Sequence, residues 1–349
     1  MKHEPVELAI VGGGAAGLFA AAVAVERGVG ALVFERRARP AAKMLMTANG
    51  RCNFTKDVPA SRMLADCGEP VASFARAALE ALPPARIAEG FKSLGLRVKR
   101  MADGRLFPAS EKAADVVHAL GDLLREKEIP IATNCAVTGL QPVKNGFIVA
   151  TKHFTVWAKN VLVATGGVSF PKTGSVGDGQ KMAAALGLRV TPLKAGLTGY
   201  DLRTPRVPRR HEDAEGRVVV DGAVRYRWRG ELEFDRAGVA GAAVYNCQRW
   251  AAKNLAAGAP FAVELAFGGE TLTLRNPTPR PLKEAIVTLG GVALDEIDPL
   301  TMAARKIPGL HFAGEVLDVD GPTGGCNLSL AFATARLAVA SVAASRERA

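Results

Sequence analysis

Cysteine and histidine are scarce in this sequence, with five of each among 349 residues. The histidines are not spaced as metal ligands, and no two cysteines have the spacing of a zinc site or a C-x-x-C redox motif. The cysteines stand singly at Cys52, Cys67, Cys135, Cys247 and Cys326. An odd number of scattered cysteines excludes a disulfide framework and is typical of a reducing compartment. We therefore expect a cytoplasmic protein without a metal site.

Aromatic residues are also scarce, at 6% of the chain, although the formal net charge is +11. Proteins that bind single-stranded nucleic acid place aromatic side chains among basic ones, so that bases can stack on them. The densest basic cluster, residues 203–210 (RTPRVPRR), contains no aromatic residue. We therefore expect the positive charge to attract an anionic cofactor or substrate, and we do not expect nucleic acid to be a partner.

A membrane span is not expected, although the uncharged run Leu8–Val25 has nearly the required length. Several glycines interrupt this run, and Glu4 and Glu7 precede it where a signal peptide would carry positive charge. The run is better interpreted as a buried strand, a tight turn and a buried helix.

The same N-terminal segment has the pattern of a dinucleotide-binding β-α-β unit. The apolar run Val6–Val11 is followed by GGGAAG, an Ala-rich helix and a second apolar run that ends near Glu35. In such units Gly12 would allow the tight turn, Gly14 would let the backbone approach a pyrophosphate, and Gly17 would let the helix pack closely. A carboxylate at Glu35 can accept hydrogen bonds from ribose hydroxyls. The complete pattern therefore predicts a bound dinucleotide.

Composition divides the chain into three parts. Residues 191–283 contain more Arg and Pro and several strand-like runs, whereas an apolar α/β pattern precedes and follows them. We predict a discontinuous nucleotide-binding domain whose first part is residues 1–190 and whose second part is residues 284–349. Residues 191–283 would form an inserted β-rich substrate domain.

Five motifs, in order along the chain, resemble one bacterial family. They are VGGGAAGLFAA, KMLMTANGRCNFT, GRLFPASEKAADVV, ATGGVSFPKTGSVGDGQKMAAALG and the C-terminal segment 288–335, which contains GEVLDVDGPTGGCN. The chain resembles the HI0933-like (YhiN/BaiN-type) FAD-dependent oxidoreductases, in a branch with a shorter middle region. The resemblance implies an α/β fold: a Rossmann-like FAD-binding domain of the two-dinucleotide-binding-domain flavoprotein type, with an inserted β-rich domain.

The resemblance also implies FAD contacts in four segments of the chain. The glycine turn and the end of the second strand supply Gly12, Gly14, Ala15, Ala16, Gly17, Glu35 and Arg36. The following loop supplies Lys43, Asn49, Gly50, Arg51 and Asn53. The central strands supply Val137, Ala164, Thr165, Gly166 and Gly167. The C-terminal motif supplies Gly314, Glu315, Gly325, Cys326, Asn327 and Leu328.

Roles within the loop follow from the same resemblance. Lys43 and Arg51 would neutralise the pyrophosphate or polarise the flavin, and Asn49 and Asn53 would hydrogen-bond its heteroatoms. We interpret Cys52 as a small buried thiol that packs under the loop. At the C-terminal motif, a helix N-terminus would face the flavin and stabilise the negative charge of its reduced form.

The sequence departs from the family where substrate contacts would be expected. Cys326 and Ser329 stand where members often have Tyr and Gln, and Asp235, Arg236 and Ala242 replace Thr, His and Pro. No acid–base constellation stands out, so the catalytic residues and the oligomeric state stay open.

We expect hydride transfer between flavin N5 and a small organic substrate bound between the two domains, in an enone or alkene reduction or an amine oxidation. NAD(P)H or another electron donor would bind transiently. A flavin-dependent tRNA-modifying enzyme and a non-catalytic flavin-binding redox sensor are the alternatives.

Overall fold

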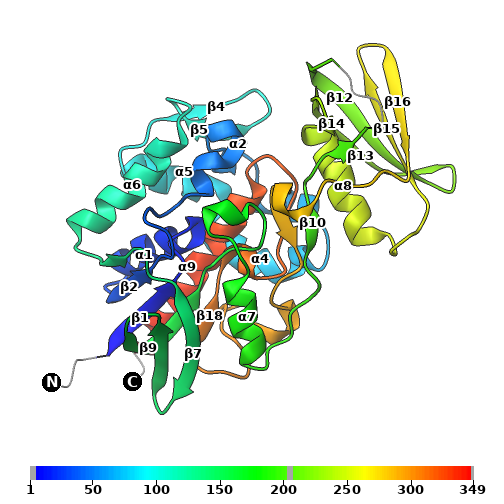
Figure 1. The fold of residues 1–349 in the computed structure, drawn as a ribbon. Coiled ribbons are helices and arrows are strands. Elements are labelled where there is room, and N and C mark those ends of the chain that lie inside the picture. The colour runs from blue at the N-terminus through cyan, green and yellow to red at the C-terminus, as the bar shows by residue number, and fades with distance from the viewer. Residues whose placement is uncertain (1–4, 203–206, 347–349) are drawn as a thin grey trace. The chain divides into compact units, whose positions relative to one another are not determined.

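The computed structural model describes residues 5–202 and 207–346, which form two compact units (Figure 1). The first unit comprises the described residues within Met1–Gly167, Pro171–Pro192 and Gly290–Ala349. The second comprises Val168–Phe170 and the described residues within Leu193–Leu289. The basic cluster at residues 203–210 begins outside the described residues, which omit 203–206.

A seven-stranded sheet forms the centre of the first unit. Its order is β6 (Ile131–Ala132), β2 (Ala31–Phe34), β1 (Val6–Val11), β9 (Thr155–Val163), β8 (Gly146–Thr151) and β7 (Val137–Val143). The start of β9 pairs antiparallel with β8, and the end of β9 pairs parallel with β18 (Leu310–Phe312). The parallel strands β2, β1, β9 and β18 therefore end side by side at one edge of the sheet.

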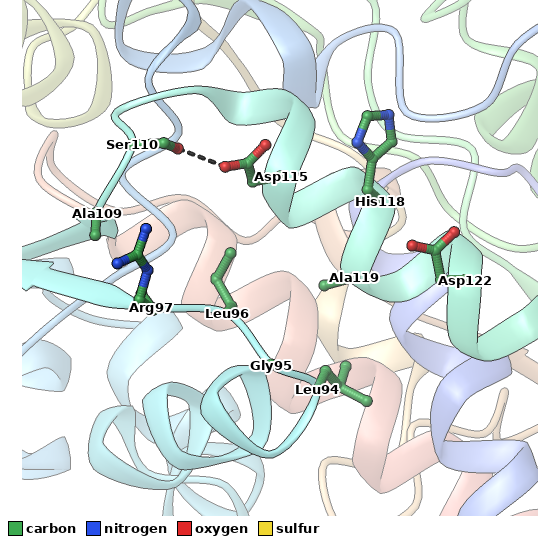
Figure 2. A pocket seen from close by; sticks show the side chains of 10 residues that line it. All are labelled: Leu94, Gly95, Leu96, Arg97, Ala109, Ser110, Asp115, His118, Ala119 and Asp122. Carbon is green, nitrogen blue, oxygen red and sulfur yellow. Dashed lines mark hydrogen bonds between the residues drawn. The ribbon is translucent and has the colours of Figure 1, made fainter.

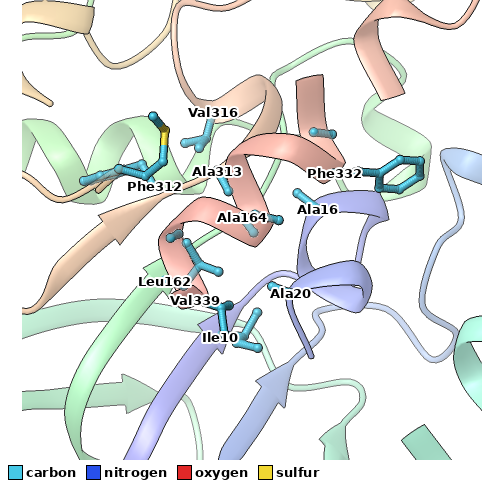
Figure 3. Packing of buried hydrophobic residues seen from close by; sticks show 14 of the residues in the cluster. Ile10, Ala16, Ala20, Leu162, Ala164, Phe312, Ala313, Val316, Phe332 and Val339 are labelled. Atoms are coloured by element: carbon cyan, nitrogen blue, oxygen red, sulfur yellow. The ribbon is translucent and has the colours of Figure 1, made fainter. Parts of the chain in front are cut away.

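Two Ala-rich helices, α1 (Ala15–Glu26) and α9 (Cys326–Arg346), pack against each other in the core of this unit. Figure 3 shows side chains from β1, α1, β9, β18 and α9 meeting in one apolar cluster. The abundance of alanine lets these helix backbones approach closely, and Phe332 fills the remaining space beside Phe19. The expectation of a buried strand, a tight turn and a buried helix at Leu8–Val25 is confirmed by β1 and α1.

By length and composition α9 could cross a membrane, with a mean hydropathy of 1.5 in its most apolar window. However, 56% of that window is buried inside the protein, as is usual for the core helix of a soluble fold.

Shorter elements surround this core. Helices α3 (Ala60–Cys67), α4 (Val71–Ala81) and α5 (Pro84–Ser93) follow the Gly-Arg-Cys-Asn loop, and α6 (Ala113–Glu126) follows a small sheet. That sheet contains β3 (Thr55–Lys56), β5 (Arg105–Pro108) and β4 (Val98–Arg100). Helix α7 (Asp178–Ala185) follows the ATGG segment after β9.

The second unit is built on a six-stranded antiparallel sheet, which makes it β-rich. Its order is β11 (Tyr200–Asp201), β14 (Gly238–Ala240), β13 (Ala223–Phe234), β12 (Arg209–Val220), β15 (Ala262–Phe267) and β16 (Glu270–Arg275). Helix α8 (Ala242–Asn254), which the composition did not predict, packs on β13 and β12. A separate pair of strands, β10 (Lys194–Gly196) and β17 (Val287–Leu289), extends this unit beyond residue 283.

Candidate dinucleotide-binding site

The turn between β1 and α1 is so tight that two of its glycines cannot carry a side chain. Gly12 has a φ of +112°, and a Cβ there would lie 2.5 Å from the carbonyl oxygen of Ala164. A Cβ on Gly17 would lie 1.8 Å from the carbonyl oxygen of Gly12. Both glycines are therefore required by the packing of the turn against β9 and against itself.

Gly14, in contrast, faces open space. It is the N-cap of α1, no side chain caps this end of the helix, and a Cβ on Gly14 would meet no atom within 4 Å. Ala15 and Ala16 begin the helix, and their side chains are too short to cover its first N–H groups. Uncapped N–H groups and the positive end of the helix dipole make this a place where a phosphate can bind.

Glu35 lies beside this turn at the end of β2, where its side chain is buried. Its Oε2 accepts a hydrogen bond from the N–H of Gly13 at 2.9 Å, and its Oε1 accepts one from the N–H of Arg37 at 2.7 Å. Burial raises the pKa of the Glu35 carboxyl, and the two N–H donors oppose that rise. Each carboxylate oxygen keeps a second lone pair that can accept from a hydroxyl group.

Arg36, the next residue, points its guanidinium at a protein carboxylate. Its Nη1 lies 2.6 Å from Oδ2 of Asp178, the first residue of α7. Sequence reasoning overlooked Asp178, although it follows directly the GSVG turn. The predicted contact between Arg36 and FAD stays a prediction, and any such contact would share the guanidinium with Asp178.

The ATGG segment passes close to α7. The side-chain Nε2 of Gln180 donates to the carbonyl of Gly166 at 3.1 Å. The hydroxyl of Thr165 is buried without a hydrogen-bond partner, and a Cβ on Gly179 would lie 2.1 Å from it. Because this hydroxyl is buried next to Gly179, it faces the interior under α7 and does not face a cleft that water can enter. Any cofactor contact from Thr165 would come from its backbone.

Three other predicted residues lie along the same sheet. Val137 is the buried first residue of β7, and Ala164 follows β9 and donates its N–H to the carbonyl of Val11. Gly167 is buried at the end of the ATGG segment.

The structure brings Lys43 and Glu315 together from positions 272 residues apart in the chain. The Nζ of Lys43 lies 2.6 Å from Oε2 of Glu315, and both side chains are partly buried, at 24% and 21% exposure. Lys43 follows β2, and Glu315 follows β18 in a short 3-10 turn, so both come from the edge where the parallel strands end. Gly314, before it, donates its N–H to the hydroxyl of Thr334 in α9 at 3.0 Å.

The Gly-Arg-Cys-Asn loop has an unusual backbone. Ala48, Asn49 and Gly50 all have left-handed φ values, of 49°, 56° and 82°, and Cys52 follows with 58°. Left-handed backbone is costly for residues other than glycine, and such strain clusters at functional sites. Arg51 braces this turn, because its Nε donates to the carbonyl of Ala48 at 3.1 Å.

The side chains of this loop divide into exposed and buried ones. Asn49 is exposed, and the Arg51 guanidinium lies 5.2 Å over the ring of Phe107. Cys52 is fully buried, as its interpretation as a packing thiol requires, and burial raises its pKa to about 11.

Asn53 is committed to protein partners. Its Nδ2 donates to the carbonyls of Thr55 and Leu106 at 2.8 and 3.0 Å, and its Oδ1 is buried without a partner. The side chain therefore ties the loop to β3 and β5. The backbone carbonyls of the neighbouring strands need a donor, which explains these two bonds, and the predicted hydrogen bond from Asn53 to the flavin stays a prediction.

The start of α9 is clamped by two close contacts. Gly325 has a φ of +97°, and a Cβ there would lie 2.6 Å from the carbonyl carbon of Thr55. Asn327 binds both backbone groups of one residue: its Oδ1 accepts from the N–H of Gly321 and its Nδ2 donates to the Gly321 carbonyl, both at 2.9 Å. Cys326 is buried and Leu328 is partly buried, so the predicted segment is held rigidly.

A surface cavity of about 280 Å³ lies elsewhere in this unit, between the turn after α5 and helix α6 (Figure 2). Its polar lining includes Arg97, His118 and Asp122, and Ser110 donates to Asp115 at 2.6 Å within it. None of the predicted cofactor residues lines it. This cavity is therefore separate from the predicted dinucleotide site at the glycine turn. Among the described residues, no group of three or more His, Cys, Asp or Glu side chains could hold a metal ion.

The glycine turn into α1, the buried acid after β2 and the parallel sheet behind them define a Rossmann-type dinucleotide-binding protein. The chain belongs to the HI0933-like protein Rossmann domain family, which matches residues 6–341.

Two relatives are similar to this chain in sequence, and one solved structure is similar to it in fold. The chain is 28% identical to the 3-dehydro-bile acid delta(4,6)-reductase of Clostridium scindens, over 95% of this chain and 97% of the relative. It is also 28% identical to the ribosomal RNA dihydrouridine synthase of Escherichia coli, over 95% of this chain and 96% of the relative. Its fold is similar to that of the 3-ketosteroid-delta4-(5alpha)-dehydrogenase from Rhodococcus jostii RHA1, with a TM-score of 0.60, 13% identity, and coverage of 97% and 96% of the two chains.

Proposed function

We propose that this chain is an FAD-dependent reductase that adds two hydrogen atoms across a C=C bond conjugated to a carbonyl group. Both relatives support this reaction class by name, one as a delta(4,6)-reductase and the other as a dihydrouridine synthase. Dihydrouridine differs from uridine by two hydrogen atoms on the ring bond next to a carbonyl group. When bound, FAD supplies two-electron hydride chemistry.

The observation that carries the cofactor assignment is the open start of α1. Gly14 has free space around it, the first N–H groups of α1 are uncapped, and Glu35 lies at the same turn. We assign the pyrophosphate to the N–H groups of α1 and the adenosine ribose to the free lone pairs of Glu35. These are the two groups by which this kind of turn recognises a dinucleotide.

The flavin end is assigned to the segments that meet around Lys43 and Glu315. Glu315 holds the ammonium group of Lys43 in place at 2.6 Å, so that one positive charge stays fixed beside the strand ends. The N-terminus of α9, with Gly325, Cys326 and Asn327, adds the partial positive charge of a helix end. The helix end would stabilise the negative charge that a flavin carries after reduction, whereas the charge of Lys43 is offset by that of Glu315.

We favour a small organic substrate over RNA. Strand β13 does alternate exposed Arg225, Arg227 and Arg229 with Tyr226 and Trp228. The basic cluster at residues 203–210 lacks this pattern. However, Tyr226 stacks on the side chains of Trp228 and Trp250 within the same unit, so the rings already have protein partners.

Two of the three arginines are engaged as well. Arg227 pairs with Glu215 and Arg229 with Asp213, at 3.6 and 3.5 Å. Both rings and two of the three arginines therefore already have protein partners, which leaves less of this strand for bases and phosphates to bind. Because one relative is named for a reaction on ribosomal RNA, uridine in RNA stays the second candidate substrate.

The test is an anaerobic single-turnover experiment. The purified protein is loaded with FAD, its flavin is reduced with dithionite, and it is mixed with 3-oxo-4-ene steroids or with a ribosomal RNA fragment. We expect a steroid enone, and not its saturated analogue, to restore the visible absorbance of oxidised flavin and to gain two hydrogen atoms by mass. Reduction of the RNA alone would assign the second candidate. Reoxidation by neither would contradict the proposed reaction and favour a non-catalytic redox sensor.

The electron donor can be identified with the same preparation. We propose that NAD(P)H or another donor binds transiently and leaves after reducing the flavin. Anaerobic addition of NADH or NADPH should then bleach the flavin without forming a stable complex.

A further inference from the structure

Two of the five cysteines meet inside the first unit, although they are 259 residues apart in the chain. Cys67 is the last residue of α3 and Cys326 is the first residue of α9. Their Sγ atoms lie 3.0 Å apart, and the residues are only 3% and 4% exposed. A disulfide bond has a length of about 2.05 Å, so a small movement of either side chain would bring the two sulfurs to bonding distance.

The surroundings are shaped around the two sulfur atoms. A Cβ on Gly321 would lie 2.2 Å from the Sγ of Cys326 and 3.1 Å from the Sγ of Cys67, so only glycine leaves room for the pair. Asn327 binds both the N–H and the carbonyl of Gly321, which fixes this glycine against the start of α9. The position of Cys326 is therefore held from both sides.

The surroundings of this pair differ from those of two other buried thiols, Cys52 and Cys247. Burial raises the pKa of Cys52 to about 11 and that of Cys247 to about 12, so both stay protonated and inert. Cys326 begins a helix of 21 residues, whose N-terminal partial positive charge favours a thiolate. It therefore combines an activating position with a second thiol in contact.

We propose that Cys67 and Cys326 are a peroxide-oxidisable dithiol that closes to a disulfide between α3 and α9. The Cys326 thiolate attacks one oxygen of hydrogen peroxide, the O–O bond breaks, and the other oxygen leaves as hydroxide, which takes up a proton to form water. The resulting sulfenic acid is attacked by the Cys67 sulfur, which forms the S–S bond and releases a second water. Two thiols and one peroxide thus become one disulfide and two waters.

Hydrogen peroxide is the class of oxidant that suits this burial. The two residues are almost inaccessible, which excludes bulky disulfides such as oxidised glutathione unless the site opens, whereas peroxide is close to water in size. The bond would link α3 covalently to the segment Gly325–Leu328. Although Cys326 also belongs to the segment assigned to the flavin end, the oxidation needs no flavin, so it can be tested apart from the proposed reductase reaction.

The test uses the full-length protein, reduced with dithiothreitol and desalted under anaerobic conditions, both with and without FAD. After treatment with hydrogen peroxide and blocking of free thiols with N-ethylmaleimide, peptides are mapped by mass spectrometry without reduction. We expect a linked pair of peptides containing Cys67 and Cys326, loss of two hydrogen atoms from the intact mass, and reversal by dithiothreitol. Equimolar oxidised glutathione should react much more slowly.

Three variants complete the experiment. Cys326→Ser and Cys67→Ser should each abolish the linked peptides, and Cys67→Ser should leave a sulfenic acid on Cys326 that dimedone captures. Cys135→Ser, which removes a buried thiol elsewhere in the same unit, should form the link at the wild-type rate. The proposal is overturned if peroxide leaves both thiols of the wild-type protein free, or if the link joins other cysteines. Because the wild-type mapping needs no variant to fold, it decides the question by itself.

Discussion

Gly14 is the residue on which the cofactor assignment depends most directly. Its Cβ position is open, so a small side chain there does not disturb the fold, and any loss of flavin reports a lost ligand contact. Gly12 and Gly17 could not be used in this way, because side chains at those positions would collide with backbone.

We predict that Gly14→Asp abolishes flavin retention in a folded protein. A carboxylate about 4 Å from a pyrophosphate charge costs about 4 kcal/mol at an effective dielectric constant of about 20, which corresponds to roughly a thousandfold in affinity. The measurement is FAD titration by fluorescence quenching, with circular dichroism to check folding. Gly90→Asp, at an open glycine on the exposed face of α5, is the control and should bind FAD normally. A Gly14→Asp protein that regains full FAD binding on addition would show that the pyrophosphate lies elsewhere.

Glu35 is predicted to hold the ribose through its carboxylate. Glu35→Gln keeps the size of the side chain but directs an NH₂ group at one of the two N–H donors, of Gly13 or Arg37. The unsatisfied donor should lower stability, and the lost acceptor for a ribose hydroxyl should cost about 1–3 kcal/mol of binding free energy, so FAD affinity should fall by about one to two orders of magnitude. Glu7→Gln is the matched control, because Glu7 also accepts a backbone N–H, from Gly30, but at the far end of β1. Unchanged FAD affinity in Glu35→Gln would remove Glu35 from the ribose.

Arg51 and Cys52 are adjacent, but we predict that only the substitution of Arg51 changes the flavin potential. An arginine near the flavin stabilises its reduced form, and for a two-electron couple about 30 mV corresponds to roughly 1.4 kcal/mol. Arg51→Met should therefore lower the potential by tens of millivolts. Cys52→Ala should leave the potential unchanged and cost about 1 kcal/mol of stability through the lost buried sulfur.

Redox titration with reference dyes measures both potentials. Arg105→Met serves as the control, since the Arg105 guanidinium also lies over the Phe107 ring, at 5.8 Å. If Cys52→Ala eliminates turnover while Arg51→Met has no effect, the thiol would be the reacting group and our interpretation of Cys52 would be wrong.

At the scale of single elements, β18 contains a buried histidine that should make the protein sensitive to acid. Burial lowers the pKa of His311 to about 4, and a hydrogen bond with the backbone of Gly309 opposes this only in part. The unfolded chain binds this proton near pH 6.5, whereas the folded protein does not bind it until about pH 4. The contribution of neutral His311 to stability is therefore complete above pH 6.5 and falls as the pH drops from about 6.5 to 4.

We predict that this single group lowers the free energy of unfolding by about 2 kcal/mol between pH 7.5 and pH 5. Urea unfolding at several pH values measures this loss. In His311→Gln the loss should be smaller by that amount, even if the variant is less stable throughout. His118→Gln, at an exposed position on α6, should keep the wild-type pH dependence. Identical slopes in wild type and His311→Gln would show that His311 is protonated in the folded protein.

The elements also show where local pattern and folded structure differ. The apolar runs of β1, α1 and the end of β9 were recognisable because most of their residues are buried. Helix α8 lies in the region that the sequence predicted to be β-rich. It contains the buried polar residues Asn246, Gln248 and Arg249. Gln248 is satisfied by β10, since it accepts from the N–H of Thr198 and donates to the carbonyl of Ala195. A helix that buries amides against a strand has no simple apolar period, which is why composition did not reveal it.

At the scale of the whole molecule, the second unit is inserted into the sequence of the first. The two segments of the first unit that flank the insertion are hydrogen-bonded to each other. The N–H of Thr191 donates to the carbonyl of Gly291 at 2.8 Å, and the N–H of Gly291 donates to the Thr191 hydroxyl at 3.0 Å. Asp318 accepts from both the Thr191 hydroxyl and the N–H of Gly290. The first unit therefore holds residues 191 and 291 together with its own hydrogen bonds.

We predict that a protein lacking residues 193–289, with Pro192 joined to Gly290 by two glycines, folds and binds FAD. Its flavin should be reducible with dithionite, but it should not reduce the substrate of the intact protein, because the predicted substrate domain is missing. Solubility, FAD stoichiometry and turnover are the measurements. The same deletion carrying Gly14→Asp is the control and should lose the flavin. A soluble protein that folds without FAD would show that the second unit is needed for cofactor binding.

The sequence by itself determined the features that depend on neighbouring residues. The β1–α1–β2 unit, with Gly12, Gly14, Gly17 and Glu35, lies within a short stretch in which glycine spacing, apolar runs and one terminal acid form a single local pattern. The family could be recognised for the same reason, because its motifs are short and contiguous. The burial of Cys52 was also predictable, since a small thiol without a nearby partner usually packs inside.

Only the tertiary structure decided which distant residues meet. The Lys43–Glu315 ion pair, the Cys67–Cys326 contact and the closure of the first unit at Thr191 each join segments at least 100 residues apart. The hydrogen bond from the Asn53 amide to the carbonyl of Leu106, 53 residues further on, also depends on the tertiary structure. Such contacts depend on how the sheet orders its strands and where the helices pack, and one-dimensional spacing carries no record of either.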